Sequence, residues 1–141
     1  MRISLAPLVV LSVIALGVLG AQSNTTIKHV PLSPTSPASG KEMFATYCAV
    51  CHGADGKGEG PAAAALKTMP ANLSQLTAKN GGTFPELRLV TTLSAGDVVA
   101  HGSSQMPVWG DLFKGLDGGK QPIAQMRVAN LIGYIKSIQA K

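Results

Sequence analysis

The sequence predicts an all-α domain. In the final segment, apolar residues recur at spacings of three and four from Ala124 to Ile138, as they do on one face of a helix, and Pro122 suits its first turn. A second helix is indicated by the tetrapeptide SGKE at residues 39–42, a capping box in which the Ser and Glu side chains satisfy free backbone amides. No segment alternates convincingly between apolar and polar residues, so we expect no strands.

The N-terminal quarter of the chain differs in composition from the rest. Residues 3–21 carry no charge and follow Arg2, which predicts that residues 1–21 are a secretory signal peptide or an uncleaved membrane anchor. Residues 22–37 are rich in Pro, Ser and Thr and are expected to form a linker. Residues 38–141 then make one small domain, exported to a compartment that tends to oxidise thiols.

Within the domain, the elements are expected in the following order. A helix over residues 40–51 is followed by a glycine-dense loop over 53–61, and a short helix is expected over 62–67. Another helix is predicted over residues 83–93, and Gly96 is placed to end it. One more helical turn is expected at residues 97–101. Met43 and Met126 fall on predicted helices, where methionine usually fills the core.

The composition leaves this domain short of large core side chains. The chain contains three Phe, two Tyr and one Trp beside 16 Gly and 9 Pro. The connections between helices are also longer than a plain bundle of this size needs, so we expect a cofactor to fill the space they enclose. The formal charge is +5, but the lysines form no run, which argues against nucleic-acid binding and leaves docking to an acidic protein partner open.

The sequence Cys-Ala-Val-Cys-His at residues 48–52 carries the clearest chemistry. The helix places Phe44, Cys48 and His52 at successive four-residue steps, with Cys51 one turn from Cys48. Two such thiols can form thioethers with the vinyl groups of one porphyrin, and the adjacent imidazole can then ligate its iron. The alternatives are a dithiol redox site, a zinc half-site without further ligands, and incidental cysteines.

With this motif the chain resembles the class I cytochrome c family, in its small bacterial monohaem form. The resemblance covers residues 38–141. It rests on Gly40 and Phe44 before the motif, the loop 53–61 after it, a Met-Pro loop with Trp109, and Tyr134 on the last helix. It implies a cytochrome c fold of about four to five short helices around one covalently bound haem c and its iron. The first and last helices are expected to cross, so that Gly40 and Phe44 meet the Tyr134 side of the last helix.

The resemblance also implies a second axial ligand and neighbouring contacts. Met106 is the expected ligand opposite His52, and Met69 and His101 are the alternatives. Pro61 matches the residue whose carbonyl accepts a hydrogen bond from the ligating histidine. Trp109 matches an aromatic residue near a haem propionate, although it could also be a plain core residue.

The implied function is single-electron transfer between redox proteins through a His/Met-ligated haem. Such a protein is not itself an enzyme, and we expect it to be exported to the periplasm and monomeric. The alternatives are a haem subunit of an oxidase or dehydrogenase complex, tethered to the membrane by residues 3–21, and a ligand-binding or peroxidatic haem protein. No phosphate-binding loop or catalytic triad is visible.

Overall fold

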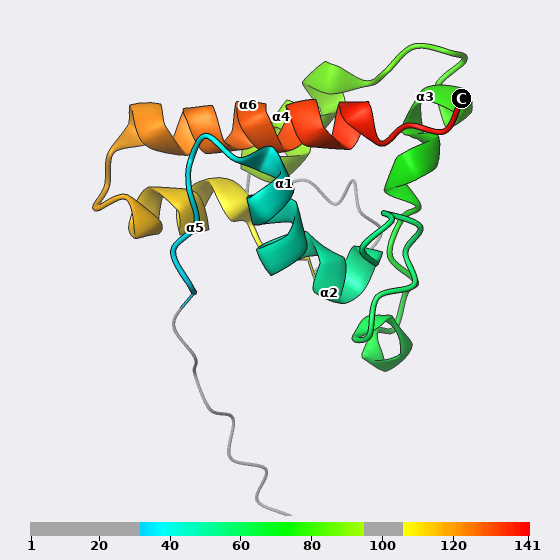
Figure 1. Cartoon of the computed structure of the whole chain (residues 1–141), viewed down its shortest axis with the longest axis horizontal. Helices are drawn as coiled ribbons and strands as arrows, with labels where there is room; N and C mark the ends of the chain where they lie inside the picture. The colour runs from blue at the N-terminus through cyan, green and yellow to red at the C-terminus, as the bar shows by residue number, and fades with distance from the viewer. Residues whose placement is uncertain (1–31, 95–105) are drawn as a thin grey trace, which may run out of the picture. The chain divides into compact units, whose positions relative to one another are not determined.

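The computed structural model describes residues 32–94 and 106–141, which lie within one compact unit, Pro31–Lys141. Within these ranges the chain forms helices and no strand, which confirms the all-α prediction (Figure 1). The elements are α1 (Gly40–Met43), the π-helical η1 (Phe44–Cys48), α2 (Ala49–His52), the 3₁₀ turns η2 (Ala63–Ala65) and η3 (Leu73–Gln75), α3 (Leu76–Lys79), α4 (Glu86–Ser94), α5 (Trp109–Leu116) and α6 (Gln121–Ser137).

The first three elements join into one helix over residues 40–52. Its start is capped by Ser39, whose Oγ accepts a hydrogen bond from the Glu42 amide at 3.2 Å. The Glu42 carboxylate accepts from the Ser36 amide at 3.2 Å rather than from Ser39, so the expected capping box is formed on one side only. The helix ends at Gly53, whose φ of +77° suits glycine.

The N-terminal helix crosses α6 at Gly40. A Cβ atom at this position would overlap the carbonyl oxygen of Asn130 in α6, so only glycine allows this close approach. Beside the crossing, the rings of Phe44 and Tyr134 lie 5.2 Å apart between centroids. The predicted crossing of the first and last helices is therefore confirmed, with the side chains expected to form it.

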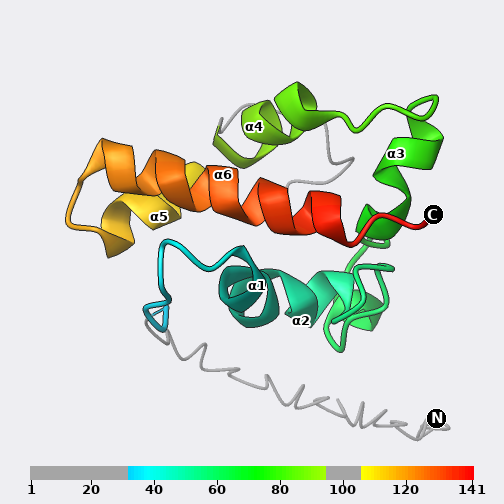
Figure 2. The ribbon, with the colours of Figure 1, turned by 45° about the horizontal axis from the view of Figure 1, so that its top comes forward.

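Helix α6 is the centre of the domain. It lies between α4 and the α1–α2 helix, and α5 runs beside it (Figure 2). The C-terminal residues fold onto the 3₁₀ turn before α3, where the Gln139 side chain donates to Leu73 O at 2.7 Å and accepts from Thr77 N at 2.9 Å. The fully buried side chains of the core come from α1, η1, α5 and α6: Met43, Phe44, Phe113 and Leu131.

Two parts of the helix prediction need correction. The helix expected over residues 62–67 is only the 3₁₀ turn Ala63–Ala65, in a segment where Leu66 is half-buried and residues 67–69 are exposed. Helix α5 was not predicted, because Gly110 and Gly115 lower its intrinsic helix propensity. It forms through tertiary packing, since Trp109 and Phe113 bury their rings in the core.

Other expectations concern single positions. Met43 is fully buried as predicted, but Met126 is 42% exposed and does not fill the core. Residues 33–37, assigned to the linker, are held against the domain by hydrogen bonds to Tyr47, Arg127 and Asn130. The expected signal or anchor, the stop at Gly96 and the turn at 97–101 lie outside the described residues.

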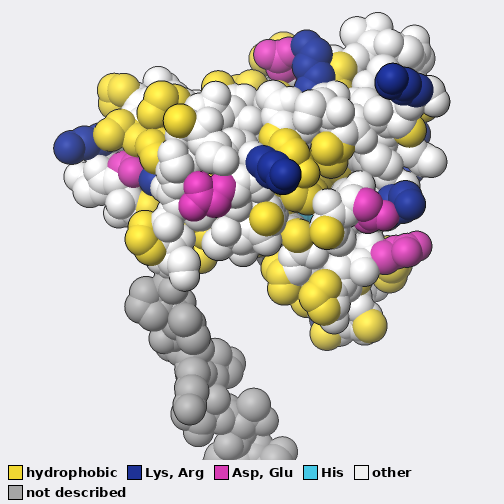
Figure 3. Space-filling view, viewed as in Figure 1, with side chains coloured by type: hydrophobic (Ala, Val, Ile, Leu, Met, Phe, Trp, Pro, Cys, Tyr) yellow, Lys and Arg dark blue, Asp and Glu magenta, His cyan; other side chains and the backbone are white. Residues whose placement is uncertain are grey.

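No helix in residues 32–94 or 106–141 has both the length and the apolar character required to span a bilayer. On the face drawn in Figure 3, lysine and arginine side chains are scattered singly, and several of them lie beside acidic side chains.

Candidate functional site

A cavity with about 800 Å³ not filled by protein atoms lies beneath the crossing of the first and last helices. Its wall is formed by the N-terminal helix, residues 66–73, α4, residues 106–109 and α6: Tyr47, Cys48, Cys51, His52, Leu66, Thr68, Met69, Pro70, Ala71, Leu73, Leu89, Thr92, Leu93, Met106, Pro107, Trp109, Leu131 and Ile135. We call this the cysteine–histidine cavity; its lining contains no Asp, Glu, Lys or Arg.

The two cysteines reach the cavity from the end of the N-terminal helix. Both are free thiols; Cys48 is buried and Cys51 is half-buried. Burial, and secondarily the neighbouring Cys51, raises the pKa of the Cys48 thiol to about 12. Such burial keeps the Cys48 thiol protonated, unlike the activated thiolate of a dithiol redox site.

His52 enters the same cavity with one ring nitrogen already engaged. Its Nδ1 lies 2.9 Å from the carbonyl oxygen of Ala71, which fixes the ring and identifies Nδ1 as the protonated nitrogen. Burial lowers the pKa of His52, and the hydrogen bond to Ala71 offsets this only in part. The imidazole is therefore held neutral, and its Nε2 lone pair is available to ligate a metal.

The hydrogen-bond acceptor for His52 differs from the prediction. The resemblance implied the carbonyl of Pro61, whereas the structure has the carbonyl of Ala71 in this role. The amides of Gly60 and Ala62 donate to carbonyls near the end of the N-terminal helix, Cys51 O at 3.0 Å and Val50 O at 2.8 Å, so this part of the loop follows the helix terminus. Pro61 is exposed and does not line the cavity. A backbone acceptor such as Ala71 leaves no signal in the sequence.

The backbone of the glycine-dense loop brings Ala71 to His52. The amide of Leu73 donates to Gly56 O at 2.6 Å, and the amide of Gly58 donates to His52 O at 2.7 Å. At Gly58, φ is +95° and a Cβ atom would overlap the carbonyl oxygen of Pro70. Glycine is thus required at this position both for its conformation and for the close approach of residues 70–73.

Both candidate methionine ligands line the cavity, but they differ in burial. Met106 is half-buried and packs against the hydrophobic core, whereas the Met69 side chain is 63% exposed. The third candidate, His101, lies outside the described residues. The more enclosed thioether is the better partner for a metal in an apolar site, so the arrangement favours Met106 over Met69.

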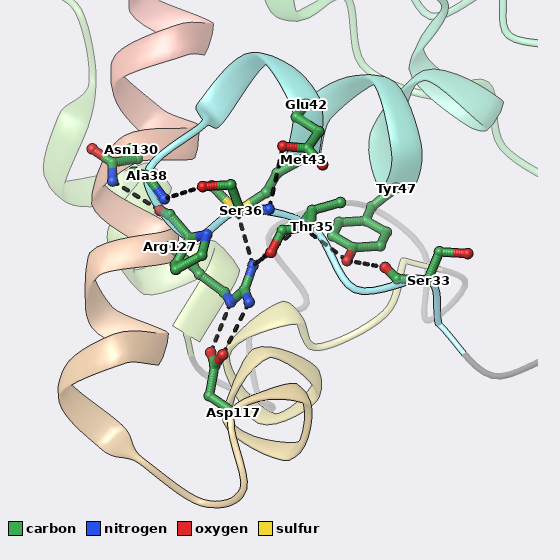
Figure 4. Close-up of polar contacts among 11 residues, drawn as sticks. Ser33, Thr35, Ser36, Ala38, Glu42, Met43, Tyr47, Asp117, Arg127 and Asn130 are labelled. Carbon is green, nitrogen blue, oxygen red and sulfur yellow. Dashed lines mark hydrogen bonds and ion pairs between the residues drawn. The ribbon is translucent and has the colours of Figure 1, made fainter.

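Trp109 is 6% exposed and lies on the cavity wall, where its ring stacks on Tyr47 with 5.3 Å between centroids. Tyr47 was not predicted to line the site, because nothing in the sequence around this residue, which directly precedes Cys48, indicates such a role. Its hydroxyl donates to Ser33 O at 2.5 Å and lies 3.1 Å from the Thr35 hydroxyl, so the polar end of the ring faces away from the apolar wall (Figure 4).

The residues present fit a haem better than a bare metal ion. In residues 32–94 and 106–141, no group of three or more His, Cys, Asp or Glu side chains could hold a metal ion. The cavity instead offers two neutral thiols, one imidazole and one thioether within a large apolar wall. Two thiols suit covalent attachment of a porphyrin, and the imidazole and thioether suit its iron.

Comparison with known proteins supports the same conclusion. A family model described as cytochrome c oxidase, cbb3-type, subunit III, matches residues 35–117, which is more than half of the chain. No curated protein and no solved structure gives a significant match. The matched range includes both cysteines, His52, Met106 and Trp109. The chain therefore belongs to the family of cytochrome c oxidase, cbb3-type, subunit III, and is an electron-transfer cytochrome that carries covalently bound haem c.

Proposed function

We propose that this protein carries single electrons between redox proteins through one haem c in the cysteine–histidine cavity. Cys48 and Cys51 would hold the haem through two thioethers, and His52 and Met106 would ligate its iron. The observation that carries the proposal is the convergence of these four side chains on one large, apolar wall without charged residues. When bound, the haem supplies an iron that alternates between Fe(III) and Fe(II).

The surrounding residues have defined tasks in this proposal. The Ala71 carbonyl holds the His52 ring through Nδ1, which keeps Nε2 directed at the metal and raises its basicity. Met106 contributes a neutral, soft sulfur donor that stabilises the reduced state. The stacked rings of Tyr47 and Trp109 exclude water from the adjoining wall. With His52 and Met106 both ligating the iron, the haem would leave no open position for a substrate and would serve electron transfer alone.

The ligand assignment is tested with Met106→Ala and Met69→Ala as a matched pair. In the oxidised protein, we expect Met106→Ala to abolish the weak Met-to-iron charge-transfer band and Met69→Ala to keep it. Retention of the band in Met106→Ala would show that another group ligates the iron. Rapid CO binding by the reduced wild-type protein would instead favour a ligand-binding or peroxidatic haem protein.

A second candidate is a haem subunit of a membrane oxidase, because the matching family is described as subunit III of such an oxidase. In this candidate, residues 3–21 remain as an anchor in the membrane and the domain faces the periplasm. Mass spectrometry of the purified protein separates the two. A start near residue 21 or 22, without co-purifying subunits, supports an exported, monomeric carrier. An intact N-terminus together with oxidase subunits supports the anchored form.

A further inference from the structure

A second hollow adjoins the cysteine–histidine cavity. It has about 830 Å³ not filled by protein atoms and lies between residues 71–80 and α4. We call it the α3–α4 groove; it is lined by Ala71, Asn72, Leu73, Leu76, Lys79, Asn80, Pro85, Arg88, Leu89 and Thr92. Ala71, Leu73, Leu89 and Thr92 also line the cavity, so the two hollows share a wall. A group that fills the cavity can therefore extend its substituents toward the groove.

The two hollows differ in charge. The cavity lining contains no charged side chain, whereas the groove contains Lys79 and Arg88 and no acid. Neither cation forms an ion pair or side-chain hydrogen bond within the described ranges, 32–94 and 106–141. By contrast, Arg127 and Lys136 are each paired with a carboxylate. One such cation on each side of the groove suits it to an anion with two negative charges.

A haem carries two such charges in its propionate groups. An ionised carboxylate is costly to bury in an apolar site unless a cation or hydrogen-bond donors compensate it. Trp109, expected near a propionate, offers one N–H donor and no charge, so it could not neutralise both groups. Resting on the haem attachment proposed above, we propose that Lys79 and Arg88 bind the propionate carboxylates of the haem in the α3–α4 groove.

The two cations have different capacities in this role. The planar guanidinium of Arg88 can bind one carboxylate through two parallel hydrogen bonds, whereas Lys79 acts as a point charge. The ionisable residues lining the two hollows are Tyr47, Cys48, Cys51 and His52 from the N-terminal helix, Lys79 from α3 and Arg88 from α4. Glu86 of α4 is paired with Lys136 of α6 at 3.4 Å. No carboxylate of the described residues lines either hollow and competes for the two cations.

The pH dependence of the midpoint potential tests this proposal. Oxidation adds a positive charge at the iron and so lowers the pKa of a nearby propionate. The potential therefore falls with rising pH between the pKa of that propionate in the oxidised protein and its higher pKa in the reduced protein. In Arg88→Met, we expect this pH region to move upward by about one pH unit or more, because an adjacent cation lowers a carboxyl pKa by about 1–3 units. Arg88→Lys should move it less, and Lys79→Met should also move it upward.

Lys114→Met is the matched control, since Lys114 is an exposed cation of α5 that lines neither hollow. It removes the same charge and should leave the pH region unchanged. If Arg88→Met and Lys79→Met give the same profile as Lys114→Met, the proposal is wrong.

Haem staining of denatured samples is done in parallel. Covalent haem with an unchanged profile overturns only the propionate assignment, whereas a wild-type protein without covalent haem overturns the proposed function as well.

A dissolved oxyanion is the other possible occupant of the groove. Addition of inorganic phosphate to the haem-containing wild-type protein, followed by NMR of the arginine side chains, distinguishes it from a propionate. If the propionates occupy the groove, phosphate should leave the Arg88 resonance unchanged. A saturable shift of that resonance, absent in Arg88→Met, would mean that the groove binds an anion from solution and would overturn the proposal.

Discussion

Arg127 forms a two-point ion pair with Asp117: Nε lies 2.7 Å from Oδ2 and Nη2 lies 2.9 Å from Oδ1 (Figure 4). The Arg127 side chain is 4% exposed and that of Asp117 is 11% exposed. The remaining guanidinium nitrogen donates to Thr35 O at 2.9 Å and to the Thr35 hydroxyl at 3.1 Å. This pair therefore fastens residues 33–37 and the connection between α5 and α6 to one buried point on α6.

Asp117→Asn should destabilise the domain substantially. The substitution removes the charge that compensates the buried Arg127 guanidinium, and breaking one side of a buried pair costs about 3 kcal/mol. Denaturant unfolding of the haem-containing protein measures the change in the free energy of unfolding. Glu86→Gln is the control because its pair with Lys136 is exposed, and it should cost less than about 1 kcal/mol. Similar losses in both variants would mean that the buried pair contributes no more than a surface pair.

The ion pair between Arg127 and Asp117 also makes the free energy of unfolding depend on pH in the acid range. The hydrogen bond and charge of Arg127 hold the pKa of Asp117 below its ordinary value of 3.8. A carboxyl with a lowered pKa in the folded state adds stability above the unfolded pKa and loses it as the pH falls through the folded pKa. The difference in unfolding free energy between wild type and Asp117→Asn should thus be constant near neutral pH and shrink below pH 3.8. A difference that stays constant down to pH 2 contradicts this account.

Gly40→Ala should separate the first and last helices. The added methyl group meets the carbonyl oxygen of Asn130 and, at 2.9 Å, the Cβ of Tyr134, neither of which can rotate away. We expect a loss of about 3 kcal/mol in the free energy of unfolding. Gly133→Ala in α6 is the matched control, because nothing lies within 4 Å of its added Cβ. This control should gain about 0.8 kcal/mol from helix propensity, and a loss equal to that of Gly40→Ala would refute the crossing argument.

The haem-free protein should lack a stable fold. In Cys48→Ala/Cys51→Ala, no thioether can form, and the cavity loses the large apolar group that would fill it. We expect no cooperative thermal transition in circular dichroism. A sharp, reversible transition of the haem-free variant would mean that the helices pack stably without the cofactor.

The parts of the structure that were predictable from sequence are those encoded by local patterns. The capping residues at 39–42 and the apolar spacing after Pro122 predicted the two crossing helices, and Gly40, Phe44 and Tyr134 meet as expected. The motif at residues 48–52 likewise indicated which side chains share one cavity. In each case, the information lies within a few residues of the element that it specifies.

What the sequence could not predict depends on contacts between distant segments. Helix α5 forms because Trp109 and Phe113 are buried, although its two glycines disfavour a helix. Arg127 lies on the buried side of α6, where its charge interrupts the apolar pattern and is explained only by Asp117 across the α5–α6 connection. The acceptor for His52 is the backbone of Ala71, and any residue type could provide it.

Redox-titrated absorption spectroscopy of the protein purified with its native N-terminus tests the central claim most directly. We predict one covalently retained haem per chain, low-spin spectra in both oxidation states and a single one-electron transition, with the Met-to-iron band present in the oxidised form. Absence of covalent haem, or a two-electron thiol couple in its place, would contradict the assignment of Cys48, Cys51, His52 and Met106 as the haem site.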